Sequence, residues 1–157
     1  MLDKKIILET LLENLRKELK DVESAANSTK DLATADDLKS EGKYDTRAIE
    51  ASYLASAQQK RVEEIKIDIQ MLEDLEIHPS TQLQMGSLAL LEYNNQSRYY
   101  FLTSTSGGTM LTINGQAVLV ISVFSPIGNE ALGLKKGESF EVETPKELRN
   151  YKILEVY

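Results

Sequence analysis

The sequence predicts an α+β protein in which an antiparallel hairpin of two long helices precedes a small antiparallel sheet with one short helix. Residues 1–77 hold 18 of the 25 acidic residues, 12 of the 18 basic residues and no proline, which is typical of long helices. Residues 78–157 hold seven of the eight glycines and all three prolines, as expected of strands joined by turns. We therefore expect domains at 1–77 and 78–157, because the residue before Pro79 is biased away from helix.

Two stretches of the first domain have the residue spacing of a coiled coil, with gaps that alternate between three and four. The first stretch contains Leu8, Leu12, Leu15, Leu19, Val22 and Ala26, and the second contains Ala48, Ala51, Ala55, Gln58, Val62, Ile65, Ile69 and Leu72. If they fold back on each other, they pair about residue 40, and the nearby Gly42 suits a turn. We therefore predict an intramolecular hairpin, and an intermolecular coiled coil is the alternative.

The expected tip of this hairpin, residues 36–45, is acidic. Asp36, Asp37 and Glu41 lie within six residues of one another. Carboxylate oxygens are the ligands that Mg²⁺ prefers, and this ion often takes only one or two from a protein. Charged residues are also ordinary in a solvated turn, so the tip residues alone leave both interpretations open.

The second domain is expected to contain six strands and one short helix. Asn94-Asn95 and Asn114-Gly115 are typical of two-residue hairpin turns. Ser125 is expected to cap a short helix that has Pro126 at its first position and ends at Gly133. The expected strands are 87–93, 98–103, 109–113, 116–123, 139–144 and 150–157.

Composition excludes several kinds of chemistry. The chain has no cysteine and one histidine, His78, so disulfides, thiolate nucleophiles and multi-histidine metal sites are excluded; His78 is interpreted as a linker residue. The net charge of −7 argues against binding of free DNA through its phosphates. The longest apolar run, residues 117–124, is too short to span a bilayer. The sequence therefore favours a cytoplasmic protein without a membrane partner.

Two segments carry a recognisable pattern. Residues 37–44 read Asp-Leu-Lys-Ser-Glu-Gly-Lys-Tyr, and residues 125–138 read Ser-Pro-Ile-Gly-Asn-Glu-Ala-Leu-Gly-Leu-Lys-Lys-Gly-Glu. Both are similar to motifs of the Gre family of bacterial transcript cleavage factors, GreA and GreB, whose tip has the form Asp-Leu-x-Glu-Asn-x-x-Tyr. Together with the expected architecture, the resemblance covers nearly the whole chain. It implies that residues 78–157 form an FKBP-like domain.

The resemblance also implies a function. In this family the second domain docks on bacterial RNA polymerase, the hairpin enters the secondary channel, and the tip carboxylates help to hold a second Mg²⁺ beside backtracked RNA. On this reading Asp37 and Glu41 are the catalytic and metal-binding residues, with Asp36 as a further metal ligand. The Mg²⁺ is shared with the polymerase active site, and the free protein is not expected to hold it tightly. The protein itself is then no enzyme, since it stimulates the nuclease activity of the polymerase.

One departure from the family pattern keeps a second function open. The usual glutamate position is occupied by Ser40, and Glu41 follows one residue later. A factor that occupies the channel without cleavage, and so modulates transcription, is therefore the first alternative. A structural or chaperone-like coiled-coil protein is the second. A prolyl isomerase is disfavoured, because the FKBP-like domain has no tryptophan to line such a site.

Overall fold

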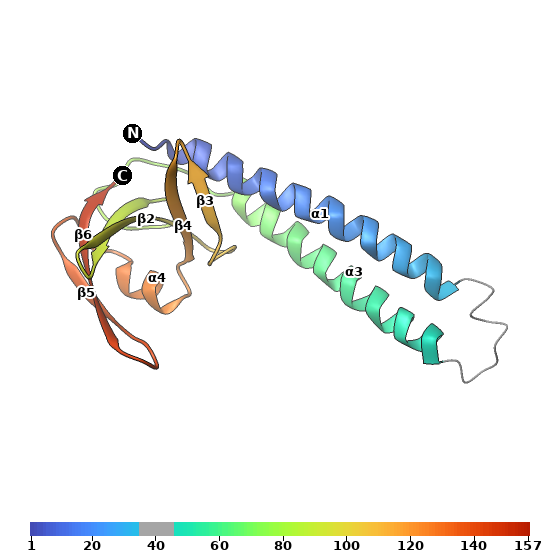
Figure 1. Cartoon of the computed structure of the whole chain (residues 1–157). Coiled ribbons are helices and arrows are strands. Elements are labelled where there is room, and N and C mark those ends of the chain that lie inside the picture. Colours follow the sequence, from blue (N-terminus) through green and yellow to red (C-terminus); the bar gives the residue numbers. More distant parts are fainter. Residues whose placement is uncertain (35–45) are drawn as a thin grey trace. The chain divides into compact units, whose positions relative to one another are not determined.

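A computed structural model describes residues 1–34 and 46–157. It confirms the predicted fold class, since a helical hairpin is followed by a six-stranded sheet with one short helix (Figure 1). The chain divides into two compact units, one formed by Glu13–Gln70 and the other by Met1–Leu12 together with Met71–Tyr157. The domain boundary expected between residues 77 and 78 stays a prediction.

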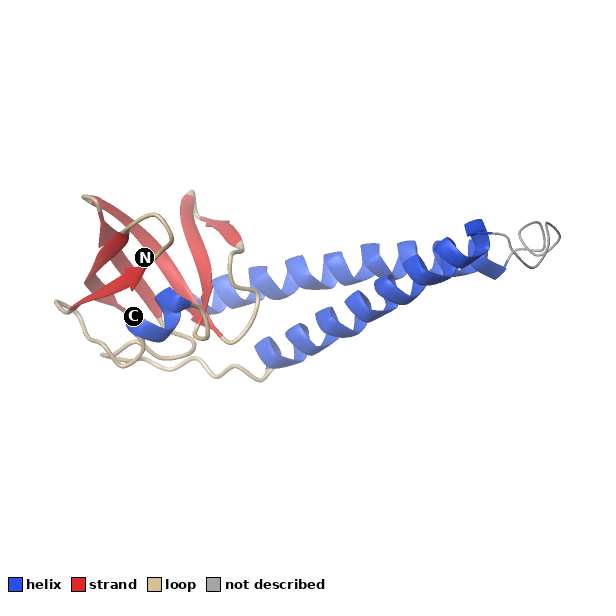
Figure 2. Ribbon diagram, turned by 90° about the horizontal axis from the view of Figure 1, so that it is seen from below, coloured by secondary structure: helices blue, strands red, loops and turns tan. Residues whose placement is uncertain are grey.

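The hairpin consists of helix α1, Lys4–Thr34, and helix α3, Thr46–Glu73. The two helices lie side by side in both views (Figures 1 and 2). Within Glu13–Gln70 the predicted seam is the least exposed face: Leu15, Ala26, Val62 and Ile65 are buried, and Leu19, Val22, Ala51, Ala55, Gln58 and Ile69 are partly buried. The apolar residues of the two seams therefore pack against each other within one chain, as the intramolecular interpretation requires.

The sheet contains every strand that the sequence predicts, with ends shifted by a few residues. The strands are β1 Leu88–Tyr93, β2 Gln96–Thr103, β3 Met110–Ile113, β4 Gln116–Ser122, β5 Ser139–Glu143 and β6 Leu148–Val156, and their order is β3-β4-β2-β1-β6-β5. Both predicted hairpin turns are present. Asn94, Asn95, Asn114 and Gly115 have φ values of 50°, 58°, 51° and 77°, as a type I′ turn demands at both central positions.

One strand pair differs from the antiparallel sheet that the sequence predicts. Strands β2 and β4 are parallel, in a register that runs from Tyr99 opposite Val118 to Thr103 opposite Ser122. The chain leaves β2, skips one strand position to form β3 at the edge, and returns through the β3–β4 hairpin into the gap. The Asn114-Gly115 turn predicts this hairpin from neighbouring residues alone. It does not predict which other strand the hairpin pairs with in the sheet. The sheet is therefore mixed.

The short helix α4, Pro126–Ala131, packs close to the end of β4. As predicted, Ser125 is its N-cap and Pro126 its first residue. A Cβ atom added to Gly128 would lie 2.0 Å from the carbonyl oxygen of Ser122, so only glycine fits at this contact. The core of this unit consists of Leu83, Ala89, Leu91, Tyr100, Leu102, Ile121, Val123, Ala131, Phe140, Val142, Tyr151 and Ile153.

Candidate functional site

The predicted metal ligands Asp36, Asp37 and Glu41 fall within residues 35–45, outside the described residues, and so does Ser40. Their roles stay predictions. In residues 1–34 and 46–157 no group of three or more histidine, aspartate or glutamate side chains is arranged to hold a metal ion. The same part of the chain contains no helix long and apolar enough to cross a membrane. His78 lies in the linker after α3, where its Nε2 is 3.0 Å from Glu76 Oε2.

A groove between α4 and the sheet is a candidate binding surface of the sheet unit. Its volume is about 390 Å³. Strands β2, β4, β5 and β6, helix α4 and the turn between β5 and β6 all contribute to it. The lining residues are Arg98, Tyr100, Leu119, Ile121, Pro126, Ile127, Val142, Glu143, Thr144, Pro145, Arg149 and Tyr151. We call this surface the α4 groove.

Aromatic rings make one side of the α4 groove rigid. The ring of Tyr151 stacks on Phe140, with centroids 5.3 Å apart, and it meets Tyr100 edge to face at 6.4 Å. Such pairs contribute about 0.5–1.5 kcal/mol each beyond their burial. Burial raises the pKa of Tyr100, so this side chain stays neutral at physiological pH. The groove floor is thus apolar and fixed in place.

A charged network near the β5–β6 turn includes the groove residue Arg149. The Tyr93 hydroxyl donates to Glu147 Oε1 at 2.7 Å, and Arg149 Nε donates to the same oxygen at 3.0 Å. The Arg149 guanidinium also lies 5.3 Å from the centre of the Tyr93 ring. The hydrogen bond to Glu147 raises the pKa of Tyr93, and the hydrogen bonds from Tyr93 and Arg149 lower the pKa of Glu147. The network holds Arg149 in one position beside the groove.

Helix α4 forms the opposite wall of the groove and is held by its cap. Ser125 Oγ donates to the Ser122 carbonyl oxygen at 2.6 Å and accepts a hydrogen bond from the Gly128 amide at 3.2 Å. These bonds place Pro126 and Ile127 in the lining. Immediately before the cap, Phe124 is 79% exposed.

The α4 groove combines an apolar floor with the guanidinium groups of Arg98 and Arg149 and the carboxylate of Glu143, and Arg149 is already bonded to Glu147. This arrangement suits an apolar side chain of a partner that has a carboxylate near Arg98, since arginine binds carboxylates through paired N–H donors. Sequence reasoning identified the α4 wall but missed the strand residues of the groove. The alternation of side chains along a strand could have identified them. It puts alternate residues of one strand on the same face of the sheet, as for 98 and 100, 119 and 121, and 149 and 151.

Comparison with known proteins identifies the class of this protein. The family model described as "Transcription elongation factor, GreA/GreB, C-term" matches residues 79–157, the part of the chain that contains the α4 groove. The chain therefore belongs to the GreA/GreB family of transcription elongation factors. Members of this family bind RNA polymerase and act on it, and they are not independent enzymes.

Individual relatives extend the similarity along the chain. Transcription elongation factor GreA of Flavobacterium johnsoniae is 28% identical over 151 residues, which cover 92% of this chain and 91% of the relative. GreA of Flavobacterium psychrophilum is 28% identical over 121 residues, or 76% of this chain and 72% of the relative. Among solved structures, Thermus aquaticus Gfh1 is 22% identical with a TM-score of 0.41, covering 98% of this chain and 93% of that one. GreA/GreB of Nitrosomonas europaea is 23% identical with a TM-score of 0.38, covering 50% and 63%.

Proposed function

We propose that this protein inserts its helical hairpin into the secondary channel of bacterial RNA polymerase and stimulates Mg²⁺-dependent cleavage of backtracked RNA. The observation that carries the proposal is the position of three carboxylates in the hairpin. Helix α1 ends at Thr34 and helix α3 begins at Thr46, and the connecting residues include Asp36, Asp37 and Glu41. The acidic cluster therefore belongs to the segment that connects the two long helices.

The donor set of this segment fits magnesium. Its metal-binding side chains are carboxylates, and the chain has no cysteine, whereas Mg²⁺ prefers hard oxygen ligands and takes few of them from any one protein. In the proposal Asp37 and Glu41 hold the ion together with the polymerase, and Asp36 is an additional ligand. A magnesium ion there supplies charge stabilisation for phosphodiester cleavage. Because the remaining ligands come from the polymerase, the free protein binds the ion weakly.

The α4 groove is the proposed docking site for the polymerase. It lies in the part of the chain that the family model matches, and its wall is the Ser125–Pro126 segment on which the resemblance rests. In this proposal an apolar side chain on the polymerase surface fills the floor, and a neighbouring carboxylate pairs with Arg98. Docking by this unit leaves the tip carboxylates free for the active site.

RNA cleavage in a stalled, backtracked elongation complex tests the role of the tip. Asp37→Asn and Glu41→Gln are each expected to lower the rate of Mg²⁺-dependent cleavage by at least tenfold, with polymerase affinity nearly unchanged. Asp21→Asn is the matched control, because Asp21 lies exposed on α1, and it is expected to cleave like wild type. Unchanged cleavage by both tip variants would remove the assignment of these ligands.

Ser40 favours a second candidate function, a modulator that occupies the channel without cleavage. A shift of one residue turns a side chain by about 100° on a helix, so Glu41 need not replace a glutamate at position 40. The double variant Ser40→Glu/Glu41→Asn restores the family pattern and separates the two functions. Cleavage by this variant but not by wild type would establish the modulator, and equal cleavage by both would establish Glu41 as a working substitute.

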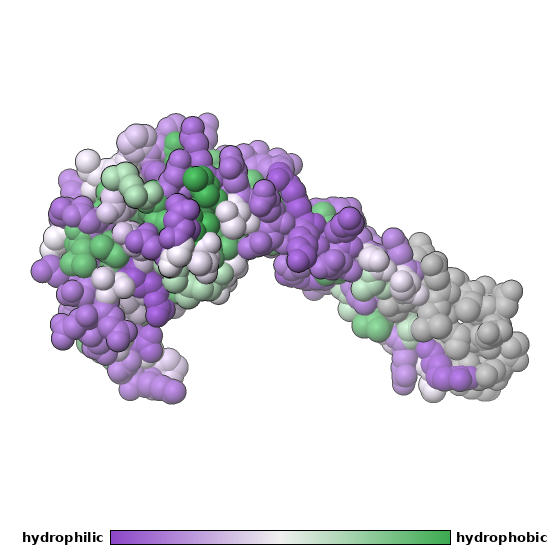
Figure 3. All heavy atoms as spheres, turned by 45° about the horizontal axis from the view of Figure 1, so that its top comes forward, coloured by the Kyte–Doolittle hydropathy of each residue, from purple (hydrophilic) through white to green (hydrophobic). Residues whose placement is uncertain are grey.

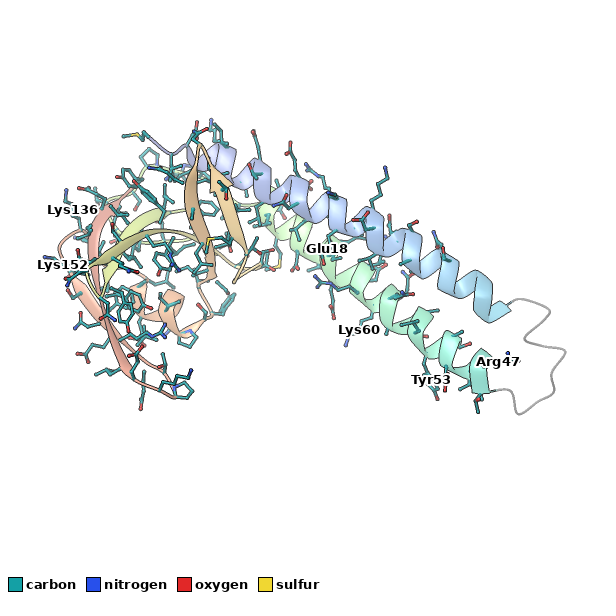
Figure 4. All side chains as sticks on the ribbon, viewed as in Figure 1. Glu18, Arg47, Tyr53, Lys60, Lys136 and Lys152 are labelled. Atoms are coloured by element: carbon teal, nitrogen blue, oxygen red, sulfur yellow. The ribbon has the colours of Figure 1, made fainter. Side chains whose placement is uncertain are left out.

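Charge reversal in the groove tests docking. Arg98→Glu is expected to weaken binding to core RNA polymerase by about tenfold or more, as for a central arginine contact. Lys152→Glu is the matched control, since Lys152 is exposed on β6 (Figure 4) and alternates with the groove residue Tyr151. Equal binding of polymerase by both variants would exclude the α4 groove as the docking site. Failure of the wild-type protein to bind polymerase would instead favour the structural or chaperone-like interpretation.

A further inference from the structure

The seam between α1 and α3 changes in composition along its length, and the change falls at Gln58. On one side of Gln58 the seam of α3 contains Val62 and Ile65, which are 2% and 0% exposed. On the other side it contains Ala51 and Ala55, which are only partly buried. Burial stabilises a contact in proportion to the apolar area that it removes from water. The alanine side of the seam is therefore held together more weakly than the side with valine and isoleucine.

Gln58 adds a defect at the point where the composition changes. Its side chain occupies a seam position, and its Oε1 atom is buried with no hydrogen-bond partner among the described residues. A buried carbonyl oxygen without a donor has lost its bonds to water and gained none in exchange, so it destabilises the packed state. Separation of the two helices at this position returns the oxygen to water. Gln58 therefore favours opening of the seam where it lies.

Packing beside Gln58 is also incomplete. A shallow hollow of about 420 Å³ lies next to this residue. The residues that line it come from both helices and are Asp21, Val22, Ala25, Ala57, Gln58 and Arg61. Atoms that border an open space have fewer partners for dispersion attraction than atoms in a filled contact. Fewer packing contacts therefore hold α1 to α3 at this point.

Two ion pairs join the helices on the valine and isoleucine side of Gln58. Arg61 Nη2 lies 2.6 Å from Glu18 Oε1, and Lys66 Nζ lies 3.7 Å from Glu23 Oε1. Figure 3 shows a mainly hydrophilic surface along the middle of the hairpin, with hydrophobic atoms beside the grey region. Exposed ion pairs contribute little individually. They nevertheless add to the apolar burial on the same side of Gln58, so the difference in strength between the two sides increases.

We propose that the hairpin opens in two stages, with Gln58 at the boundary. In the first stage the distal segment, residues 24–34 of α1 and 46–57 of α3, separates while the proximal segment, residues 13–23 and 59–70, stays paired. The change in seam composition, the unpaired oxygen and the hollow coincide at one position, which favours a defined boundary over gradual fraying. The first stage changes the distance between the end of α1 and the start of α3 without unfolding the rest of the hairpin. It is a property of the hairpin itself and does not depend on the proposed function.

Native-state hydrogen exchange of the full chain, read by NMR for each amide, tests the two stages. Amides of residues 25–28 and 51–56 are expected to exchange through one shared opening, about tenfold or more faster than those of Leu15 and Ile65. Gln58→Leu removes the unpaired oxygen and is expected to slow exchange of the distal amides about five- to tenfold. Gln59→Leu is the matched control, since Gln59 is exposed on the same helix, and it should change these rates by less than about twofold.

Ile65→Val distinguishes two stages from a single opening of the whole hairpin. It is expected to speed exchange of the proximal amides about two- to tenfold and to leave the distal amides unchanged, because the distal segment opens before the contacts of Ile65 break. Equal acceleration of both groups would overturn the proposal, since it would show that the hairpin opens as one unit. A steady fall in exchange rate from the helix ends, with no step at Gln58, would show ordinary fraying instead. Equal exchange in wild type and Gln58→Leu would remove Gln58 as the boundary.

Discussion

Replacement of Gly128 by alanine tests how α4, one wall of the α4 groove, packs against β4. The new Cβ would lie 2.0 Å from the Ser122 carbonyl oxygen, 2.8 Å from its carbonyl carbon and 2.9 Å from the Val123 Cα. All three atoms belong to the backbone, and Cβ atoms essentially never come closer than 3.0 Å to such neighbours. Alanine therefore requires α4 and the end of β4 to separate by about 1 Å.

Such a separation breaks contacts that depend on short distances. The Ser125 cap bonds to the Ser122 carbonyl and from the Gly128 amide are 2.6 and 3.2 Å long, and loss of an N-cap costs about 1 kcal/mol. Forcing an extra carbon into a packed contact typically costs 1–3 kcal/mol. We therefore expect Gly128→Ala to lower the free energy of unfolding by about 3 kcal/mol. For a unit of this size that corresponds to a fall in Tm of roughly 10–20 °C.

Urea unfolding followed by circular dichroism provides the assay, and Asn129→Ala is the control. Asn129 lies exposed on the same helix, so its replacement should change the unfolding free energy by less than about 0.5 kcal/mol. The reasoning fails if Gly128→Ala unfolds at the same urea concentration as Asn129→Ala. A destabilised but folded variant should also bind RNA polymerase more weakly, since Pro126 and Ile127 would move away from the groove.

Two further predictions concern polar side chains. Gln58 occupies a seam position, and its Oε1 is buried with no hydrogen-bond partner among the described residues. Gln58→Leu is therefore expected to stabilise the hairpin by about 1 kcal/mol. A thermal unfolding midpoint below that of wild type would contradict this prediction. Glu147 has a pKa below its ordinary value of 4.5, so it stabilises the fold above that value and the contribution is lost as the pH falls through the lower folded pKa. Glu147→Gln should therefore reduce the slope of stability against pH between about 5 and 3, and an unchanged slope would show that the network has no stabilising role.

Local sequence signals predicted most of the sheet. Two-residue turns at Asn94-Asn95 and Asn114-Gly115 fix both their conformation and the register of their hairpins, because the residues at their centres favour positive φ. The capping of α4 was equally local, since Ser125 and Pro126 act on the residues that follow them. The parallel pairing of β2 with β4 was not predictable in this way. It depends on which gap in the sheet the β3–β4 hairpin fills, and that is decided by packing of the whole unit.

Only the part of the candidate site that lies within one segment of the chain could be predicted from the sequence. The α4 wall could be identified because it is one continuous segment, whereas Arg98, Tyr100 and Arg149 come from separate strands that only the folded sheet brings together. The carboxylates at the tip were identified from their spacing in the sequence. They belong to residues 35–45, which lie outside the described residues. The sequence thus predicts chemistry that lies within one segment better than chemistry assembled from several.

The composition of the hairpin seam explains how stability is distributed along the helices. Toward the base the seam contains Leu15, Val62 and Ile65, which bury large apolar surfaces, whereas toward the distal end it contains Ala26 and Ala55. Each buried methylene contributes about 0.8 kcal/mol, so the distal seam holds the two helices together more weakly than the proximal seam. In return, alanine lets the helices approach each other closely and makes that end slender.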